Sequence, residues 1–177
     1  RFPWAGEAPS NTGSFLIWQQ PHYIYLAEEM YRANPSAETL KTYADNVEAT
    51  AEFMADFVTP VPVRSGSRAT KHYALIGATA MQESMSKDFS YNHPFELAYW
   101  RYGLSVANEW RERMGKPRHA EWDEIVNNMA PLPLTKEGII TAGLPKGKTT
   151  GLKSCDPFDA VAAGAAPVLA TETFTDK

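Results

Sequence analysis

Cysteine is nearly absent from this chain of 177 residues, in which Cys155 stands alone. A single cysteine excludes an internal disulfide framework and leaves the compartment open. Long hydrophobic runs are lacking as well. The longest covers 160–170, is interrupted by Gly164 and Pro167, and is shorter than the roughly 20 residues that a membrane-spanning helix needs. We therefore expect no membrane partner.

Dense clusters of basic residues and metal-ligand spacings are also missing. The net charge is −4, and without a basic patch we expect no nucleic-acid partner. Zinc-ligand spacing is absent from the four histidines, which are His22, His72, His93 and His119. Ser10 and Ser84 do not lie in a nucleophile-elbow pattern. We predict no metal and no cofactor.

The residues that are present describe an ordinary globular protein. The length is in the range of one domain, and 44% hydrophobic with 21% charged residues is a typical balance. Aromatic residues make up 12% of the chain. Beside polar loops they would suit a sugar site, although burial in the core is their more usual place.

Four segments repeat their apolar residues at the spacing of an amphipathic α-helix. They cover about 21–33, 37–57, 94–114 and 120–130. Ser36 is a favoured cap for the second helix, and Gly115 is a favoured stop for the third. Because the turns within each pair are short, we expect two antiparallel αα-hairpins. The predicted fold class is mainly α, with at most short strands.

The connecting segments carry weaker patterns. Residues 59–93 lack helical spacing, and we expect a long irregular loop with one possible short strand at 72–76. Another possible strand covers 139–141. Residues 144–177 are rich in Gly, Lys, Thr and Ala, so we predict a weakly patterned tail or linker after a domain of residues 1–143.

Each predicted hairpin is preceded by a polar and aromatic loop. Trp18, Gln20 and His22 lead into the first helix, and Glu83 to Glu96 lead into the third. If the hairpins pack side by side in the same sense, both loops lie at one end. Helix N-termini favour bound oxygen atoms, and aromatic, amide and carboxyl groups bind sugars. We therefore predict a sugar site at this end.

Glu83 is the candidate general acid of this site. Glycoside hydrolysis needs one protonated carboxyl group and usually a second carboxylate. The alternative is an ordinary exposed loop glutamate, and Asp88 is a second candidate acid in the same loop. Glu96 falls at the third helical position, where it could contact substrate or stabilise the helix start.

The candidate substrate contacts are Trp18, Gln20, His22, Asn92 and Glu96. For Trp18 and His22 the alternative is structural, with the indole packing on the hairpin and the imidazole helping the helix to start. The aromatic residues at helical spacing in the third helix are expected in the core.

Three segments resemble the six-hairpin glycosidases, the (α/α)6-toroid glycoside hydrolases related to families 65 and 95. They are 17–28 (IWQQPHYIYLAE), 82–83 (QE) and 92–104 (NHPFELAYWRYGL). The resemblance covers about 1–143, and it departs from the family pattern at Tyr23 and at 80–81. It implies an active site at the N-terminal ends of the inner helices and six hairpins in all, with the second carboxylate on a later hairpin.

Since this chain shows two hairpins, the resemblance implies a fragment of a glycoside hydrolase that is incomplete without the rest of its parent chain. The implied partners are a carbohydrate substrate and either the remainder of the parent chain or a second copy. The competing prediction is a non-catalytic helical domain that binds carbohydrate or protein, for which no acid is required.

Overall fold

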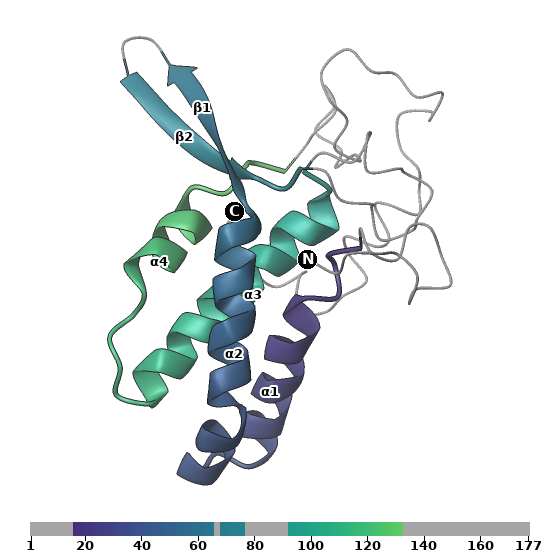
Figure 1. Cartoon of the computed structure of the whole chain (residues 1–177), viewed down its shortest axis with the longest axis vertical. Helices are drawn as coiled ribbons and strands as arrows, with labels where there is room; N and C mark the ends of the chain where they lie inside the picture. The colour runs from purple at the N-terminus through teal and green to yellow at the C-terminus, as the bar shows by residue number, and fades with distance from the viewer. Residues whose placement is uncertain (1–15, 66–67, 77–91, 133–177) are drawn as a thin grey trace, which may run out of the picture.

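The structure is a computed structural model that describes residues 16–65, 68–76 and 92–132. Within these ranges the protein is mainly α, with one small sheet of two strands (Figure 1). The elements in chain order are α1 Pro21–Ala33, α2 Ala37–Phe57, β1 Thr59–Ser65, β2 Arg68–Ala74, α3 Pro94–Arg113 and α4 Ala120–Asn127. The predicted mainly α class is confirmed. Glu83, Asp88, the possible strand at 139–141 and the tail at 144–177 lie outside the described residues.

The predicted helix boundaries coincide with local backbone chemistry. The Ser36 hydroxyl accepts a hydrogen bond from the Thr39 N–H at 3.1 Å, which satisfies one of the unpaired donors of the first turn of α2. Gly115 has φ +72° and ends α3 in the left-handed conformation that glycine adopts without strain. Pro21 and Pro94 open α1 and α3, where a missing N–H costs no helical bond.

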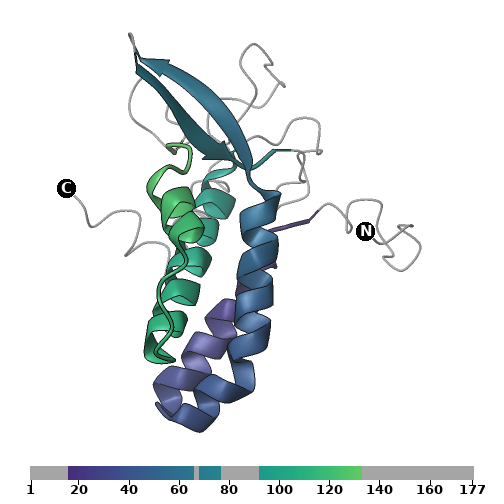
Figure 2. The same cartoon turned by 60° about the vertical axis from the view of Figure 1, so that its left-hand side comes forward.

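The region after α2 corrects one prediction. Residues 60–62 and 65–67 were expected in a loop, but β1 and β2 form an antiparallel pair over Thr59–Ser65 and Arg68–Ala74. Residues 66–67 lie outside the described residues. Figure 2 shows this hairpin extending beyond the helices. α4 also ends at Asn127, earlier than the predicted 130, because Tyr73 in β2 pairs with the chain that follows: its N–H donates to Asn128 at 2.8 Å.

The two prolines of β1 are the reason that the sequence predicted a loop here, and their orientation explains why a strand forms. The Tyr73 N–H and C=O both bond to the 128–130 segment, so they point away from β1. Pro60 stands directly opposite Tyr73, and by the alternation of an antiparallel pair its ring nitrogen faces the outer edge of β1. Pro62, two residues on, faces the same edge. Prolines are tolerated there because no ladder bond is lost.

The two helical hairpins pack so that α1 and α3 run in the same direction. Trp18 lies beside Phe95, at a ring distance of 6.5 Å. Further along both helices, Tyr25 lies 6.4 Å from Tyr102, and Tyr31 lies 5.9 Å from Trp110. Since the partners advance together along the two helices, the N-termini of α1 and α3 lie at one end of the bundle.

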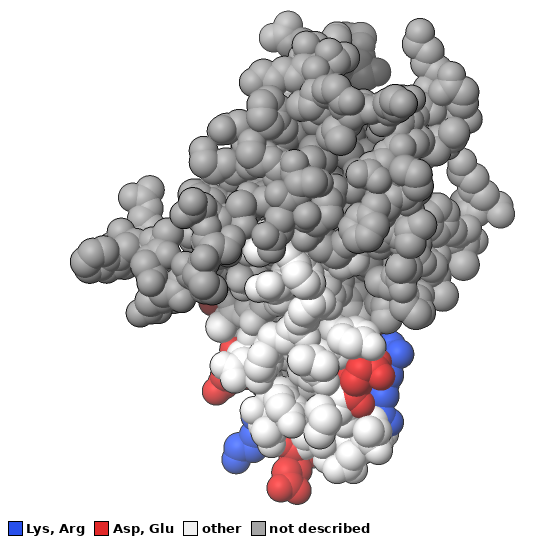
Figure 3. Space-filling model, turned by 90° about the vertical axis from the view of Figure 1, so that its right-hand side faces the viewer, with Lys and Arg blue, Asp and Glu red and all other residues white. Residues whose placement is uncertain are grey.

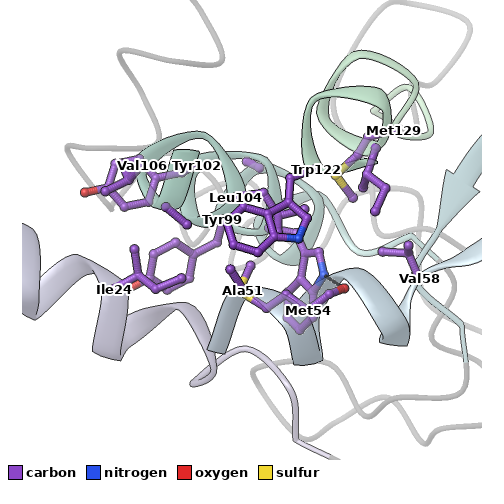
Figure 4. Close-up of a cluster of buried hydrophobic side chains, with 14 of the residues drawn as sticks. Ile24, Ala51, Met54, Val58, Tyr99, Tyr102, Leu104, Val106, Trp122 and Met129 are labelled. Carbon is purple, nitrogen blue, oxygen red and sulfur yellow. Dashed lines mark hydrogen bonds between the residues drawn. The ribbon is translucent and has the colours of Figure 1, made fainter. Parts of the chain in front are cut away.

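α3 is the central helix, and most of its residues are buried, as expected for a helix that is packed on several sides. Figure 4 shows its side chains among those of α1, α2 and α4. The Trp100 indole donates to the Met54 carbonyl at 2.8 Å. At Gly103 a Cβ atom would lie 2.8 Å from Met54 Cε and 3.3 Å from Pro21 Cβ, so the missing side chain allows α1 and α2 to approach α3 closely. The aromatic residues predicted in the core of α3 are buried.

Candidate functional site

Trp18 and His22 lie at the shared N-terminal end of α1 and α3. The His22 ring meets the Trp18 ring edge-on at 5.2 Å, and His22 Nδ1 is hydrogen-bonded to the Tyr99 hydroxyl at 2.5 Å. Phe95 completes the group, at 5.5 Å from the Tyr99 ring. We call these four residues, Trp18, His22, Phe95 and Tyr99, the aromatic cluster. It links the first turn of α1 to the first two turns of α3.

Burial sets the protonation state of this cluster. It lowers the pKa of His22 and raises the pKa of Tyr99 well above its ordinary value, because burial disfavours the charged form of each group. At neutral pH the imidazole is uncharged and the phenol keeps its proton. Where the Tyr99 hydroxyl donates to Nδ1, the imidazole carries its proton on Nε2.

Glu96 lies in the first turn of α3 and is 1% exposed. Burial raises its pKa to about 8. Its Oε1 atom has no hydrogen-bond partner among the residues that the structure describes. The helix-stabilising role suggested by the sequence assumed a charged glutamate, whereas this carboxyl group is largely protonated at neutral pH. A buried acid that keeps its proton can donate it or form a hydrogen bond to a neutral oxygen.

The face of α3 that carries Glu96 points toward the other hairpin. Gly103 follows Glu96 by seven residues, or two turns, and therefore lies on the same face. Gly103 packs against Met54 of α2 and Pro21 of α1. The Glu96 face thus adjoins the face that carries Phe95 and Tyr99.

Asn92 shapes the entry to α3. It has φ +54°, a conformation that asparagine tolerates better than most residues. Its Oδ1 accepts the Leu75 N–H at 2.9 Å, and its own N–H donates to the Leu75 carbonyl at 3.0 Å. The side-chain oxygen is thus used by the fold, and a contact with substrate would have to come from the amide nitrogen.

Gln20 lies elsewhere. It is exposed and lines an open hollow of about 460 Å³ between α1 and α2, together with Tyr23, Asn46 and Phe53 among other residues. The structure therefore brings Trp18 and His22 to α3 and places Gln20 on the α2 side of α1. The sequence had grouped the three because they are neighbours in the chain.

Two residues of the aromatic cluster were not among the predicted contacts. Phe95 and Tyr99 were expected only in the core, although their spacing of four residues puts them on one helix face. The pairing of Tyr99 with His22 spans 77 positions and leaves no local signal. Within the described ranges, no group of three or more His, Cys, Asp or Glu side chains is placed to hold a metal ion.

The part of the chain described here contains no helix with both the length and the apolar character that a membrane span requires.

No protein-family model matches the sequence, and comparison with curated proteins finds no match. In the described residues, the fold and the site together define a mainly α protein with two helical hairpins, and with the aromatic cluster and the buried Glu96 at one end.

Proposed function

We propose that this chain is part of a glycoside hydrolase of the six-hairpin toroid type, which cleaves glycosidic bonds by general acid catalysis. The observation that supports this best is the shared N-terminal end of α1 and α3. There the side chains of Trp18, His22 and Tyr99 are in contact, and Glu96 is a buried acid in the first turn of α3. Such an end is where the resemblance to toroid hydrolases places the active site.

In this proposal Glu83 is the proton donor. The acid transfers its proton to the glycosidic oxygen as the bond from that oxygen to the sugar carbon breaks, and a second carboxylate activates water or attacks the sugar directly. The second carboxylate belongs to a later hairpin of the parent chain. The two carboxyl groups must lie about 5–10 Å apart, with the substrate between them.

The other residues of the site bind the sugar. Trp18 offers an aromatic edge and face, and His22 a neutral imidazole whose Nε2–H is a hydrogen-bond donor. Glu96 in its protonated form can donate to a sugar oxygen without adding a charge. Asn92 contributes through its amide nitrogen, and Gln20 contacts the part of a longer substrate that extends over the α2 side of α1.

The alternative is a non-catalytic domain that binds carbohydrate or protein. One observation favours its carbohydrate form: the hollow beside Gln20 is lined by amide and aromatic side chains. Such a surface binds sugars without an acid.

The test is Glu83→Gln in the full-length parent, assayed on a panel of oligosaccharides, with Asp88→Asn as the matched comparison from the same loop. Removal of a general acid should lower turnover at least about a hundredfold while sugar binding is retained. Turnover near that of the wild type would remove Glu83 from the mechanism, and a large loss in Asp88→Asn alone would transfer the role to Asp88. Binding without any hydrolysis by the unaltered parent would favour the alternative.

A further inference from the structure

The hollow between α1 and α2 has the size and place of a small-molecule site. Its volume is about 460 Å³, within the roughly 300–1,000 Å³ typical of ligand pockets. It lies where the turn before α1 meets the middle of α2. The helices α1 and α2 pack side by side (Figures 1 and 2). The aromatic cluster occupies the α3 side of α1, so the two features are separate.

Polar groups line the hollow from both helices. Gln19 and Gln20 come from the turn before α1 and are exposed. Their backbone is fixed, because the Gln20 N–H donates to Ile17 at 2.9 Å and the Gln19 carbonyl accepts from His22 at 3.0 Å. Asn46 and Thr50 lie one turn apart on α2. Primary amides and hydroxyls offer both donors and acceptors, which matches a ligand rich in hydroxyl groups.

One hydrogen bond arranges these groups in advance. Asn46 Nδ2 donates to the Tyr23 hydroxyl at 3.0 Å, which joins α2 to α1 across the hollow. Because the Tyr23 oxygen accepts this bond, its own proton points elsewhere and can be donated to a ligand. Asn46 Oδ1 is the matching acceptor. A donor and an acceptor are thus held side by side before any ligand binds, which reduces the entropy cost of binding.

An aromatic ring completes the lining. Phe53 is 45% exposed and lines the hollow, so its ring is accessible to a ligand. Its ring lies 6.0 Å from Phe57, which restricts its orientation. An exposed ring attracts the partly positive C–H groups of a sugar to its electron-rich face.

The lining is also uncharged. None of the described residues that line the hollow is Asp, Glu, Lys or Arg. A charged ligand would lose water there without gaining an opposite charge, whereas a neutral polyol would exchange water hydrogen bonds for amide ones.

We propose that this hollow is a binding site for a neutral pyranose ring of a saccharide. Phe53 stacks on the ring, and Gln19, Gln20 and Asn46 bond its hydroxyls. The site requires no catalytic step, so it is compatible with a hydrolase, in which it would hold a distal part of the substrate, and with a non-catalytic domain.

The experiment titrates the ¹⁵N-labelled full chain with maltose, cellobiose and lactose, and follows the side-chain NH₂ signals of Gln19, Gln20 and Asn46. We expect saturable shifts of these signals with millimolar affinity, because the hollow is open. Glucuronic acid and glucosamine should shift them less. Phe53→Ala should weaken binding about two- to tenfold, the range of one aromatic contact, and Met30→Ala, an exposed apolar residue outside the hollow, should leave it unchanged.

The proposal is overturned if none of the three neutral sugars shifts these signals at up to about 50 mM, or if the shifts survive unchanged in both Phe53→Ala and Asn46→Ala. Asn46→Ala alters an exposed position and serves if Phe53→Ala fails to fold, as judged by its helical circular dichroism. The Glu83→Gln variant separates this site from the hydrolase proposal. Binding in the hollow should persist in that variant whether or not hydrolysis is lost.

Discussion

At the scale of single residues, Glu28 and Glu96 are both almost fully buried, yet they have opposite electrostatics. Burial alone acts on Glu96 and raises its pKa to about 8. Burial also raises the pKa of Glu28, but hydrogen bonds from Arg113, Trp110 and Arg32 outweigh it, and the pKa falls below its ordinary value. Partners therefore decide the charge of a buried acid. The Glu28 carboxyl group is therefore ionised and holds its partners in place, whereas the Glu96 carboxyl group keeps its proton.

The raised pKa of Glu96 predicts that the free energy of unfolding depends on pH. The folded chain holds the Glu96 proton up to about pH 8, while the unfolded chain releases it near the ordinary value of 4.5. Because the folded state binds more protons in between, the free energy of unfolding should fall as pH rises through this window, by up to about 1.4 kcal/mol per pH unit. Glu96→Gln cannot titrate and should remove this slope in urea unfolding measured from pH 5 to about pH 8.

The control is Glu121→Gln, which replaces an exposed glutamate of α4 and should keep the slope of the unaltered chain. Parallel pH profiles for Glu96→Gln and the unaltered chain would show that Glu96 does not hold its proton in the folded state.

At the scale of the elements, side-chain contacts between the C-terminal halves of α1 and α3 hold these two parallel helices together, away from the candidate site. Glu28 on α1 accepts the Trp110 indole N–H at 2.8 Å and two guanidinium bonds from Arg113 at 2.5 and 3.2 Å. Arg113 also lies over the Tyr31 ring at 4.6 Å. This fixes the C-terminal halves of both helices. The register of their N-terminal halves, and so the meeting of His22 with Tyr99, follows from it.

We expect Glu28→Gln to lower the free energy of unfolding by about 2–4 kcal/mol, because the buried carboxylate is replaced and a partly exposed guanidinium and an indole N–H lose the charge of their acceptor. Chemical denaturation at pH 7 measures this. Glu29→Gln is the matched control, since the Glu29 carboxylate is half exposed and its only described ion pair is a 3.7 Å contact with Arg32. Its effect should stay within about 0.5 kcal/mol. Equal losses in the two variants would argue against Glu28 as the fastening point.

At the scale of the whole molecule, α1 presents apolar side chains to solvent. Leu26 is 59% exposed and Met30 is 50% exposed, and their spacing of four residues puts them on one face. Figure 3 looks onto the side where α1 lies in Figure 1, and the described surface there is mostly uncharged. Apolar surface of this kind often marks an interface.

The isolated chain should therefore self-associate at tens of micromolar in sedimentation velocity, and the double variant Leu26→Ser, Met30→Ser should shift it toward monomer. Met114→Ser, which changes an exposed apolar residue just after α3, should leave the association unchanged. A stable monomer at every concentration would instead indicate a self-sufficient domain.

The sequence by itself determined the four described helices and most of their ends, the exception being the C-terminal end of α4. Ser36 as a cap, Gly115 as a stop and the prolines at the start of α1 and α3 act on backbone groups within a few residues, so their effect does not depend on the rest of the fold. The apolar spacing also identified α3 as a helix with core aromatics. These features are local, and local hydrogen bonding and backbone dihedral angles settle them.

Only the tertiary structure decided the rest of the site. The proline-containing strand β1 forms because β2 offers its partner groups. Gln20 separates from Trp18 because one turn directs their side chains to different helices, and Glu96 keeps its proton because packing removes water from its carboxyl group. Burial and partnership depend on residues far apart in the chain, such as His22 and Tyr99, and short-range patterns carry no information about them.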